Sequence, residues 1–183
     1  TLVIRKQTAA EIEQRRAEQQ EFLSVDHVHI RELSAEITPQ KDRSVELSFS
    51  SEAPVERYDW YEDHAYNEIL GHSPGNIDLT RLSSIGVMLW NHDQDSPIAR
   101  IDSVSLDEKN KKCRAVVVFD CDEDSETLYQ KVLSGTLKGV SVGYKVRRWE
   151  KVDEGVTTTD GFAGPAMIAR DWEPLEISLV SVP

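Results

Sequence analysis

The sequence predicts a mainly β protein with peripheral helices, an α+β fold whose antiparallel strands form a distorted barrel or sandwich. Val45, Leu47 and Phe49 alternate with polar residues, which is the period-two pattern of a half-buried strand. Residues 115–119 form a valine-rich run, which is typical of a buried strand. Similar apolar or alternating patterns predict strands over 87–90, 98–106, 140–146 and 175–182.

One helix is predicted over residues 125–134. Acidic residues precede it, Leu128 and Val132 lie on one side of it, and Gly135 follows where a C-terminal cap belongs. Residues 151–165 are rich in Gly, Thr and Asp, which predicts a long surface loop between the last two strands.

The first part of the chain differs from the rest. Thr8 and Glu11 have the spacing of a capping box, and they open a polar stretch over 12–23 with too few apolar positions to face a core. Pro39 then closes this region. We therefore expect residues 1–43 to form an N-terminal helical arm or propeptide, and residues 44–183 to form the main domain.

The composition excludes two classes of partner. No run approaches the roughly 20 apolar residues that a spanning helix needs, and the chain turns polar four residues after its start, unlike a signal peptide. We expect a soluble, cytosolic protein that does not enter a membrane. The formal net charge of -12 and the lack of a dense basic stripe argue against nucleic acid as a partner. The chain does not begin with methionine, which predicts a processed or trimmed form.

Neither cysteine pairing nor a metal site is predicted. Cys113 and Cys121 are eight strand steps apart, about 26 Å, whereas a disulfide needs Cα atoms within about 7 Å. We expect two reduced thiols. His27 and His29 would share one strand face, but no third ligand follows at a suitable spacing. We therefore expect no metal and no cofactor.

Ser141 has the most informative surroundings in the sequence. In a strand over 140–146, Ser141 shares one face with Gly139 and Gly143, while the alternate apolar residues face the core. Glycine in a strand often marks close approach by a ligand, and a nucleophile that attacks a peptide bond needs such clearance. The alternative is a solvent-facing serine beside a glycine-marked bulge.

The order of residues in the sequence and their distance along the strand limit which residue could be the base that activates Ser141. The Gly-x-Ser-x-Gly pattern also fits the nucleophile elbow of α/β-hydrolases, but that elbow needs a strand-to-helix turn and a later histidine, and no histidine follows His92. Lys145 would lie about 13 Å away along the strand, and Lys138 is on the other face. A histidine from another element is the better base.

His92 is the best placed histidine, since it follows the apolar run 87–90 and precedes a turn-rich stretch. His64 and His72 flank a polar region, and we expect both at the surface. Glu176 is an acid on the polar face of the predicted last strand, where it could orient an imidazole. A solvated carboxylate is the alternative for Glu176.

Six segments together resemble the tailed-bacteriophage prohead (procapsid) maturation proteases, which are related in fold to herpesvirus assemblin. The resemblance runs from about Val45 to the end of the sequence. In chain order, the segments are SSEAPVER (50–57), EIL (68–70), DLTRL (78–82), LWNHD (89–93), SGTLKGVSVGY (134–144) and LEISLV (175–180).

The resemblance implies an assemblin-like antiparallel β-barrel over residues 44–183 and a serine endopeptidase activity. It places Ser141 as the nucleophile, His92 as the general base and Glu176 as the third member of the triad. The backbone N–H groups of Val142 and Gly143 are our candidates for the oxyanion hole.

The implied job is the cleavage of scaffold and major capsid protein segments, and of the protease itself, inside the immature procapsid in the host cytoplasm. A capsid protein fused downstream and a homodimer are also consistent with the family. Two alternatives stay open: a catalytically silent capsid-assembly scaffold or binding module of the same fold, and a general serine esterase.

Overall fold

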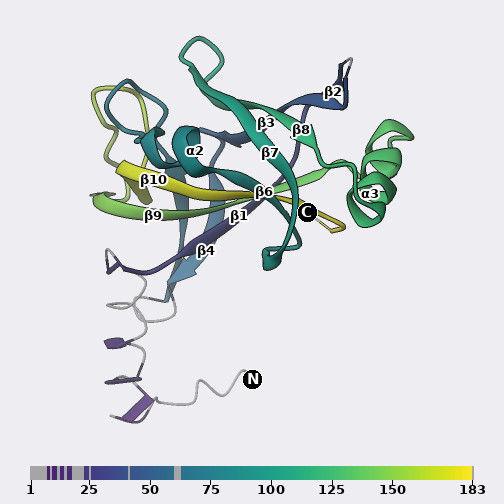
Figure 1. Cartoon of the computed structure of the whole chain (residues 1–183). Helices are drawn as coiled ribbons and strands as arrows, with labels where there is room; N and C mark the ends of the chain where they lie inside the picture. The colour runs from purple at the N-terminus through teal and green to yellow at the C-terminus, as the bar shows by residue number, and fades with distance from the viewer. Residues whose placement is uncertain are drawn as a thin grey trace.

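The computed structural model describes residues 8, 10–11, 13–14, 16–17, 23–24, 26–40, 42–59 and 63–182. Within this part of the chain, ten strands form one sheet that curls around a single main core (Figure 1). The predicted mainly β fold with peripheral helices is confirmed. The comparison with assemblin stays a prediction. None of the helices in the described ranges is long and apolar enough to cross a membrane.

The strands and helices have the following bounds: β1 His29–Ser34, β2 Ile37–Pro39, β3 Ser44–Ser51, β4 Val55–Asp59, β5 His64–Leu70, α2 Thr80–Ile85, β6 Val87–Trp90, β7 Asp93–Asp107, β8 Lys112–Phe119, α3 Glu123–Leu133, β9 Gly139–Val152 and β10 Ala166–Val180.

The last strand in sequence lies in the middle of the sheet. The strand order is β1-β9-β10-β6-β7-β8-β3-β2, and β4 and β5 join through a pairing of β5 with β10. β10 runs antiparallel to β9 on one side and parallel to both β5 and β6 on the other. β10 therefore links segments that are far apart in the sequence.

Residues 29–39 contain β1 and β2, the two strands at opposite ends of the strand order, and so connect the two ends of the curled sheet. β1 pairs with β9, and β2 pairs with β3, while only two residues separate β1 from β2. The Ala35 N–H donates to the Lys138 carbonyl at 3.1 Å, and the Ser48 N–H donates to the Glu36 carbonyl at 3.2 Å. These residues lie within the range 1–43 that we expected as an arm, but in the structure they are part of the sheet.

The capping box predicted near the start is confirmed. The Thr8 N–H donates to a Glu11 carboxylate oxygen at 2.7 Å, and the Glu11 N–H donates to the Thr8 hydroxyl at 3.3 Å. The described residues between 10 and 17 are helical. The rest of the predicted stretch 12–23 lies largely outside the described residues.

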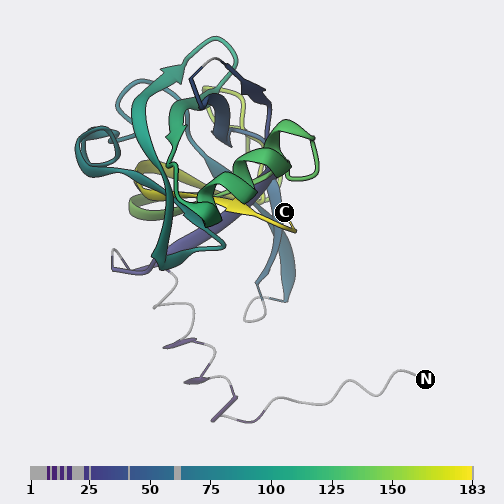
Figure 2. The ribbon, with the colours of Figure 1, turned by 45° about the vertical axis from the view of Figure 1, so that its right-hand side comes forward.

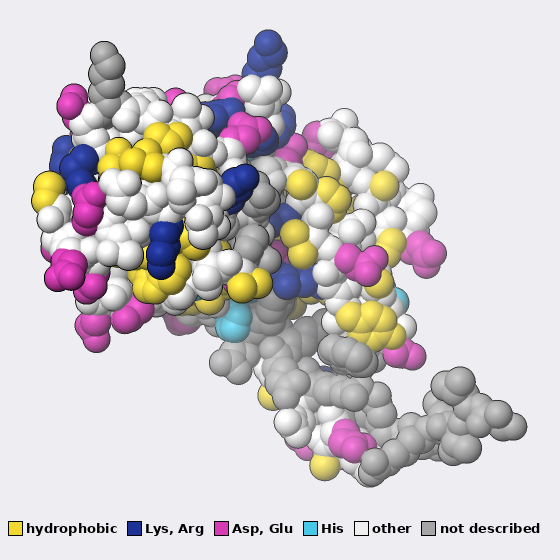
Figure 3. All heavy atoms as spheres, turned by 90° about the vertical axis from the view of Figure 1, so that its right-hand side faces the viewer, with side chains coloured by type: hydrophobic (Ala, Val, Ile, Leu, Met, Phe, Trp, Pro, Cys, Tyr) yellow, Lys and Arg dark blue, Asp and Glu magenta, His cyan; other side chains and the backbone are white. Residues whose placement is uncertain are grey.

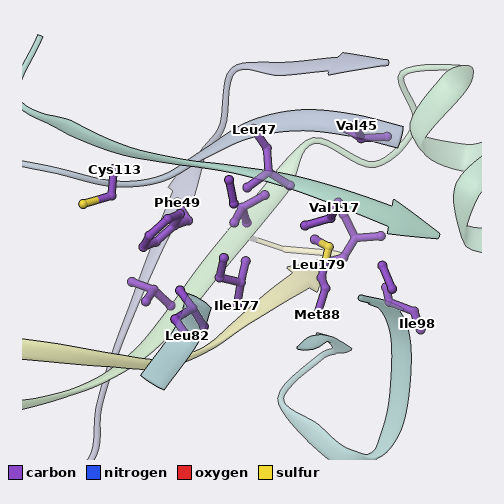
Figure 4. Packing of buried hydrophobic residues seen from close by; sticks show 14 of the residues in the cluster. Val45, Leu47, Phe49, Leu82, Met88, Ile98, Cys113, Val117, Ile177 and Leu179 are labelled. Atoms are coloured by element: carbon purple, nitrogen blue, oxygen red, sulfur yellow. The ribbon is translucent and has the colours of Figure 1, made fainter. Parts of the chain in front are cut away.

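The core lies inside the curl. Val45, Leu47 and Phe49 of β3 are buried, as their alternation predicted. Figure 4 shows them converging with apolar side chains of β6, β8 and β10 and with Leu82 of α2. Charged side chains of both signs are interspersed over the face shown in Figure 3.

Three predicted elements are confirmed with different ends. α3 begins two residues earlier than expected because the Asp122 side chain accepts the Ser125 N–H at 3.0 Å and caps it. α3 packs at one end of the curled sheet (Figure 2). β9 extends to Val152, and β10 begins at Ala166. The loop between them is therefore two residues shorter than the predicted loop over 151–165.

Candidate active site

His92 lies in the tight turn between β6 and β7. Trp90 pairs with Asp93, and the two residues between them have positive φ, 49° at Asn91 and 62° at His92. This is the pattern of a type I′ hairpin, which favours Asn and Gly at its central positions. A histidine there costs roughly 1–2 kcal/mol in backbone energy. Such strained residues cluster at functional sites.

Hydrogen bonds fasten this turn to the central strand β10. The Asn91 N–H donates to the Leu179 carbonyl at 3.0 Å, and the Asn91 side-chain oxygen accepts the Ser181 N–H at 3.3 Å. The His92 N–H donates to the Ser178 hydroxyl at 3.1 Å. The backbone of His92 is therefore fixed relative to β10.

The imidazole of His92 is paired with Glu176. Its Nδ1 lies 2.7 Å from Glu176 Oε1, and both side chains are about one-fifth exposed, at 22% and 20%. A carboxylate accepts at this contact, so Nδ1 carries a proton, and the neutral tautomer with this proton has its lone pair on Nε2. In the part of the chain that the structure describes, Nε2 is buried and has no hydrogen-bond partner. This is the arrangement that a general base needs.

The carboxylate of Glu176 lies over Gly143. The two residues are register partners in the β9–β10 ladder, and a Cβ added at Gly143 would lie 2.5 Å from Glu176 Oε1. Our interpretation of Gly143 as clearance for a substrate was wrong, because the acidic partner of His92 fills that space.

Ser141 lies two residues from Gly143, between β1 and β10, with Glu32 and Ser178 as its register partners. Its side chain is fully buried, and its hydroxyl donates to the Arg31 carbonyl at 3.2 Å. The open strand face predicted around Ser141 is therefore wrong. No hydrogen bond joins Ser141 to His92 within the described ranges. In the β9–β10 ladder, Ser141 lies opposite Ser178, two residues along from the position opposite Glu176.

The two oxyanion-hole candidates lie inside the sheet. Val142 and Gly143 have register partners in β1 on one side and in β10 on the other. Backbone N–H groups in such a strand normally bond to their neighbours in the ladder. The role of Val142 and Gly143 stays a prediction.

A second serine–histidine contact was missed by the sequence analysis. Ser50 Oγ lies 2.8 Å from His72 Nε2, and His72 Nδ1 donates to the Leu70 carbonyl at 2.8 Å. Both side chains have no exposed surface, so His72 is not a surface residue as we expected. Burial lowers the pKa of His72 to about 4. Both ring nitrogens of His72 are occupied, by the Ser50 hydroxyl and the Leu70 carbonyl, and we therefore interpret this pair as structural.

The remaining candidates carry no site. In the described ranges, no three His, Cys, Asp or Glu side chains gather as metal ligands. His27 and His29 lie edge to face with ring centroids 4.6 Å apart. Burial lowers the pKa of His29 to about 4. Cys113 is buried, Cys121 is exposed, and they do not pair, as predicted.

Comparison with known proteins identifies the family of the chain. The family described as "Caudovirus prohead serine protease" matches residues 57–183, well over half of the chain. The "Major capsid protein" of Halomonas phage phiHAP-1 is 34% identical over 139 residues, which is 74% of this chain and 21% of that protein. The chain thus spans about a fifth of the length of this curated relative. No solved structure gives a significant match. The chain belongs to the caudovirus prohead serine protease family.

Proposed function

We propose that this chain is a serine endopeptidase of procapsid maturation that uses Ser141 as nucleophile, His92 as general base and Glu176 as the orienting acid. The observation that carries the proposal is the 2.7 Å contact between His92 and Glu176, two residues separated by 84 positions. The contact fixes the imidazole tautomer and leaves Nε2 without a partner in the described part of the chain.

The reaction follows the acyl-transfer chemistry of serine peptidases. Ser141 Oγ attacks the scissile carbonyl carbon while His92 Nε2 takes the hydroxyl proton. The C–N bond then breaks, and His92 returns the proton to the leaving amine. Water attacks the acyl-enzyme, again giving a proton to His92, and the acid product leaves as Ser141 recovers its proton. Glu176 stabilises the imidazolium that forms in both halves of the reaction.

The structure has Ser141 in a resting position. Its hydroxyl must exchange the Arg31 carbonyl for His92 Nε2, and exchanging one hydrogen bond costs on the order of 1 kcal/mol. Because Ser141 has no exposed surface, a substrate reaches it only after a covering segment shifts. The N–H groups of Val142 and Gly143 would serve as the oxyanion hole only if their ladder partners give way in the same shift.

We propose the major capsid protein and scaffold segments as substrates, cleaved inside the immature procapsid in the host cytoplasm. The similarity to one fifth of a phage major capsid protein supports a link to capsid protein. We further propose a fusion in which capsid sequence follows the protease. Cleavage at the junction of such a fusion would be autoproteolysis. We also propose a homodimer, on family resemblance alone.

The test is a cleavage assay with intact-mass detection. The chain is incubated with its capsid protein as wild type, Ser141→Ala and His92→Ala, with Ser50→Ala as the matched control because Ser50 is equally buried and bonds a different histidine. Discrete products should appear with wild type and Ser50→Ala and be absent with the other two. Products from Ser141→Ala at the wild-type rate would contradict the proposal.

The buried Ser141 hydroxyl, bonded to a backbone carbonyl rather than to His92, also fits a catalytically silent scaffold of the same fold. A phosphonate probe separates the two functions, because it adds its mass at Ser141 only if that serine is activated. A general esterase would hydrolyse small esters but leave peptide bonds intact. Turnover of a small ester without peptide products in the cleavage assay would therefore identify an esterase.

A further inference from the structure

The Ser178 side chain forms hydrogen bonds to both members of the His92–Glu176 pair. Its hydroxyl accepts the His92 backbone N–H at 3.1 Å and donates to Glu176 Oε2 at 2.7 Å. Its side chain is fully buried. We infer that Ser178 is a positioning residue of the active site, which sets both the ring of His92 and the carboxylate of Glu176; this rests on the proposed function.

The Ser178 hydroxyl makes both contacts with a single atom. The two contacts require one group that accepts from an N–H and donates to a carboxylate at the same time. The substitution Ser178→Ala would remove the hydrogen-bond partner of both the His92 N–H and Glu176 Oε2. Since Ser178 itself has no exposed surface, these groups would lose a hydrogen bond without full replacement by water.

The strand geometry explains why this serine follows Glu176 by two positions. Side chains two apart on a strand share a face, so both point toward the same side of β10. β10 runs parallel to β6, with Leu179 opposite Trp90, where the His92 turn begins. Ser178 therefore lies beside the turn between β6 and β7. Its hydrogen bond to the His92 N–H helps to hold the backbone of His92, whose φ is 62°.

The same contacts argue against Ser178 as a nucleophile. Its proton is directed to Glu176 Oε2 and its oxygen accepts the His92 backbone N–H, so the hydroxyl is already engaged in holding both members of the pair. Ser141 lies directly across the β9–β10 ladder from Ser178 and has no bond to the acid. Covalent labelling by a phosphonate should map to Ser141 alone, and a label on Ser178 would overturn the inference.

The experiment compares Ser178→Ala with wild type and with Ser50→Ala. Removing a supporting hydrogen bond of a catalytic group typically costs about 10–100-fold. We expect kcat of Ser178→Ala to fall by that factor with KM unchanged within about twofold, while Ser50→Ala keeps the wild-type kcat.

Proton NMR of the imidazole supplies a readout that does not depend on turnover. The Nδ1 proton of His92, assigned by its loss in His92→Ala, should shift or broaden in Ser178→Ala and stay unchanged in Ser50→Ala. An unchanged His92 signal together with unchanged kcat in Ser178→Ala would overturn the inference. A wild-type protein that cleaves nothing, with a His92 signal that still responds to Ser178→Ala, would refute the proposed function and leave the positioning role standing.

Discussion

Gly143→Ala should impair catalysis through a contact that the sequence does not reveal. The new Cβ would lie 2.5 Å from Glu176 Oε1, whereas ordinary contact begins at 3.4 Å, so the oxygen must retreat by about 0.9 Å. If the oxygen moves directly away from His92 Nδ1, the 2.7 Å contact lengthens to about 3.6 Å and no longer counts as a hydrogen bond. The backbone at Gly143 is not left-handed, so the effect is steric alone.

Misplacing a catalytic contact by about 1 Å costs on the order of 100-fold in rate. We expect kcat of Gly143→Ala to fall by that order, with products followed by intact mass. Unfolding should remain cooperative, since the displaced carboxylate is partly exposed and can turn toward solvent. In a Glu176→Ala background the clash is gone, so Gly143→Ala should then have little further effect. Wild-type cleavage by Gly143→Ala would refute the geometry, and an equal loss in the Glu176→Ala background would refute the steric explanation.

Three further predictions concern the turn, the buried histidine and the thiols. His92→Gly should be more stable than His92→Ala by about 1 kcal/mol in urea unfolding, because glycine adopts the left-handed conformation freely, and both should be inactive; equal stabilities would contradict the turn. The pKa of His72 is lowered from 6.5 to about 4, so its neutral form stabilises the fold above pH 6.5, and that stability is lost as the pH falls toward 4. From this group alone the protein should be about 2 kcal/mol less stable at pH 5 than at pH 7.5, and His72→Gln should show less pH dependence than wild type. Burial raises the pKa of Cys113 to about 12, so a thiol reagent at pH 8 should modify Cys121 alone in the native protein and both cysteines after denaturation; fast native labelling of Cys113 would argue against its burial.

Short-range patterns predicted most of the strands but not the segment that bridges them. The alternation of Val45, Leu47 and Phe49 is visible in eight residues, so β3 could be found from sequence. β1 was missed because its partner strand β9 lies about 110 residues away, as the bond between Ser141 and Arg31 shows. The polar ends of β9 and β10 were also missed, because their pairing with each other, not their apolar content, keeps them extended.

The contact between His92 and Glu176 was predicted, but its surroundings were not. His92 and Glu176 were paired correctly, because an acid on the polar face of a strand and a histidine at a strand end both stand out against their surroundings. Ser178 was overlooked, although its place two residues after Glu176 puts it on the same face. His72 was misplaced because nothing in its local sequence marks the buried Ser50 with which it bonds.

The central position of β10 has a consequence for timing during protein synthesis. A ribosome makes the His92 turn and the Ser141 strand long before it adds Glu176, Ser178 and Leu179, to which that turn is bonded. Until those residues emerge, the nascent chain has a serine and a histidine but nothing to orient them. Under the proposed function, a protease that acts on its own polypeptide would therefore be inert until β10 has been made. The place of β10 in the sheet would then delay the first cut until the strand that carries Glu176 and Ser178 is in position.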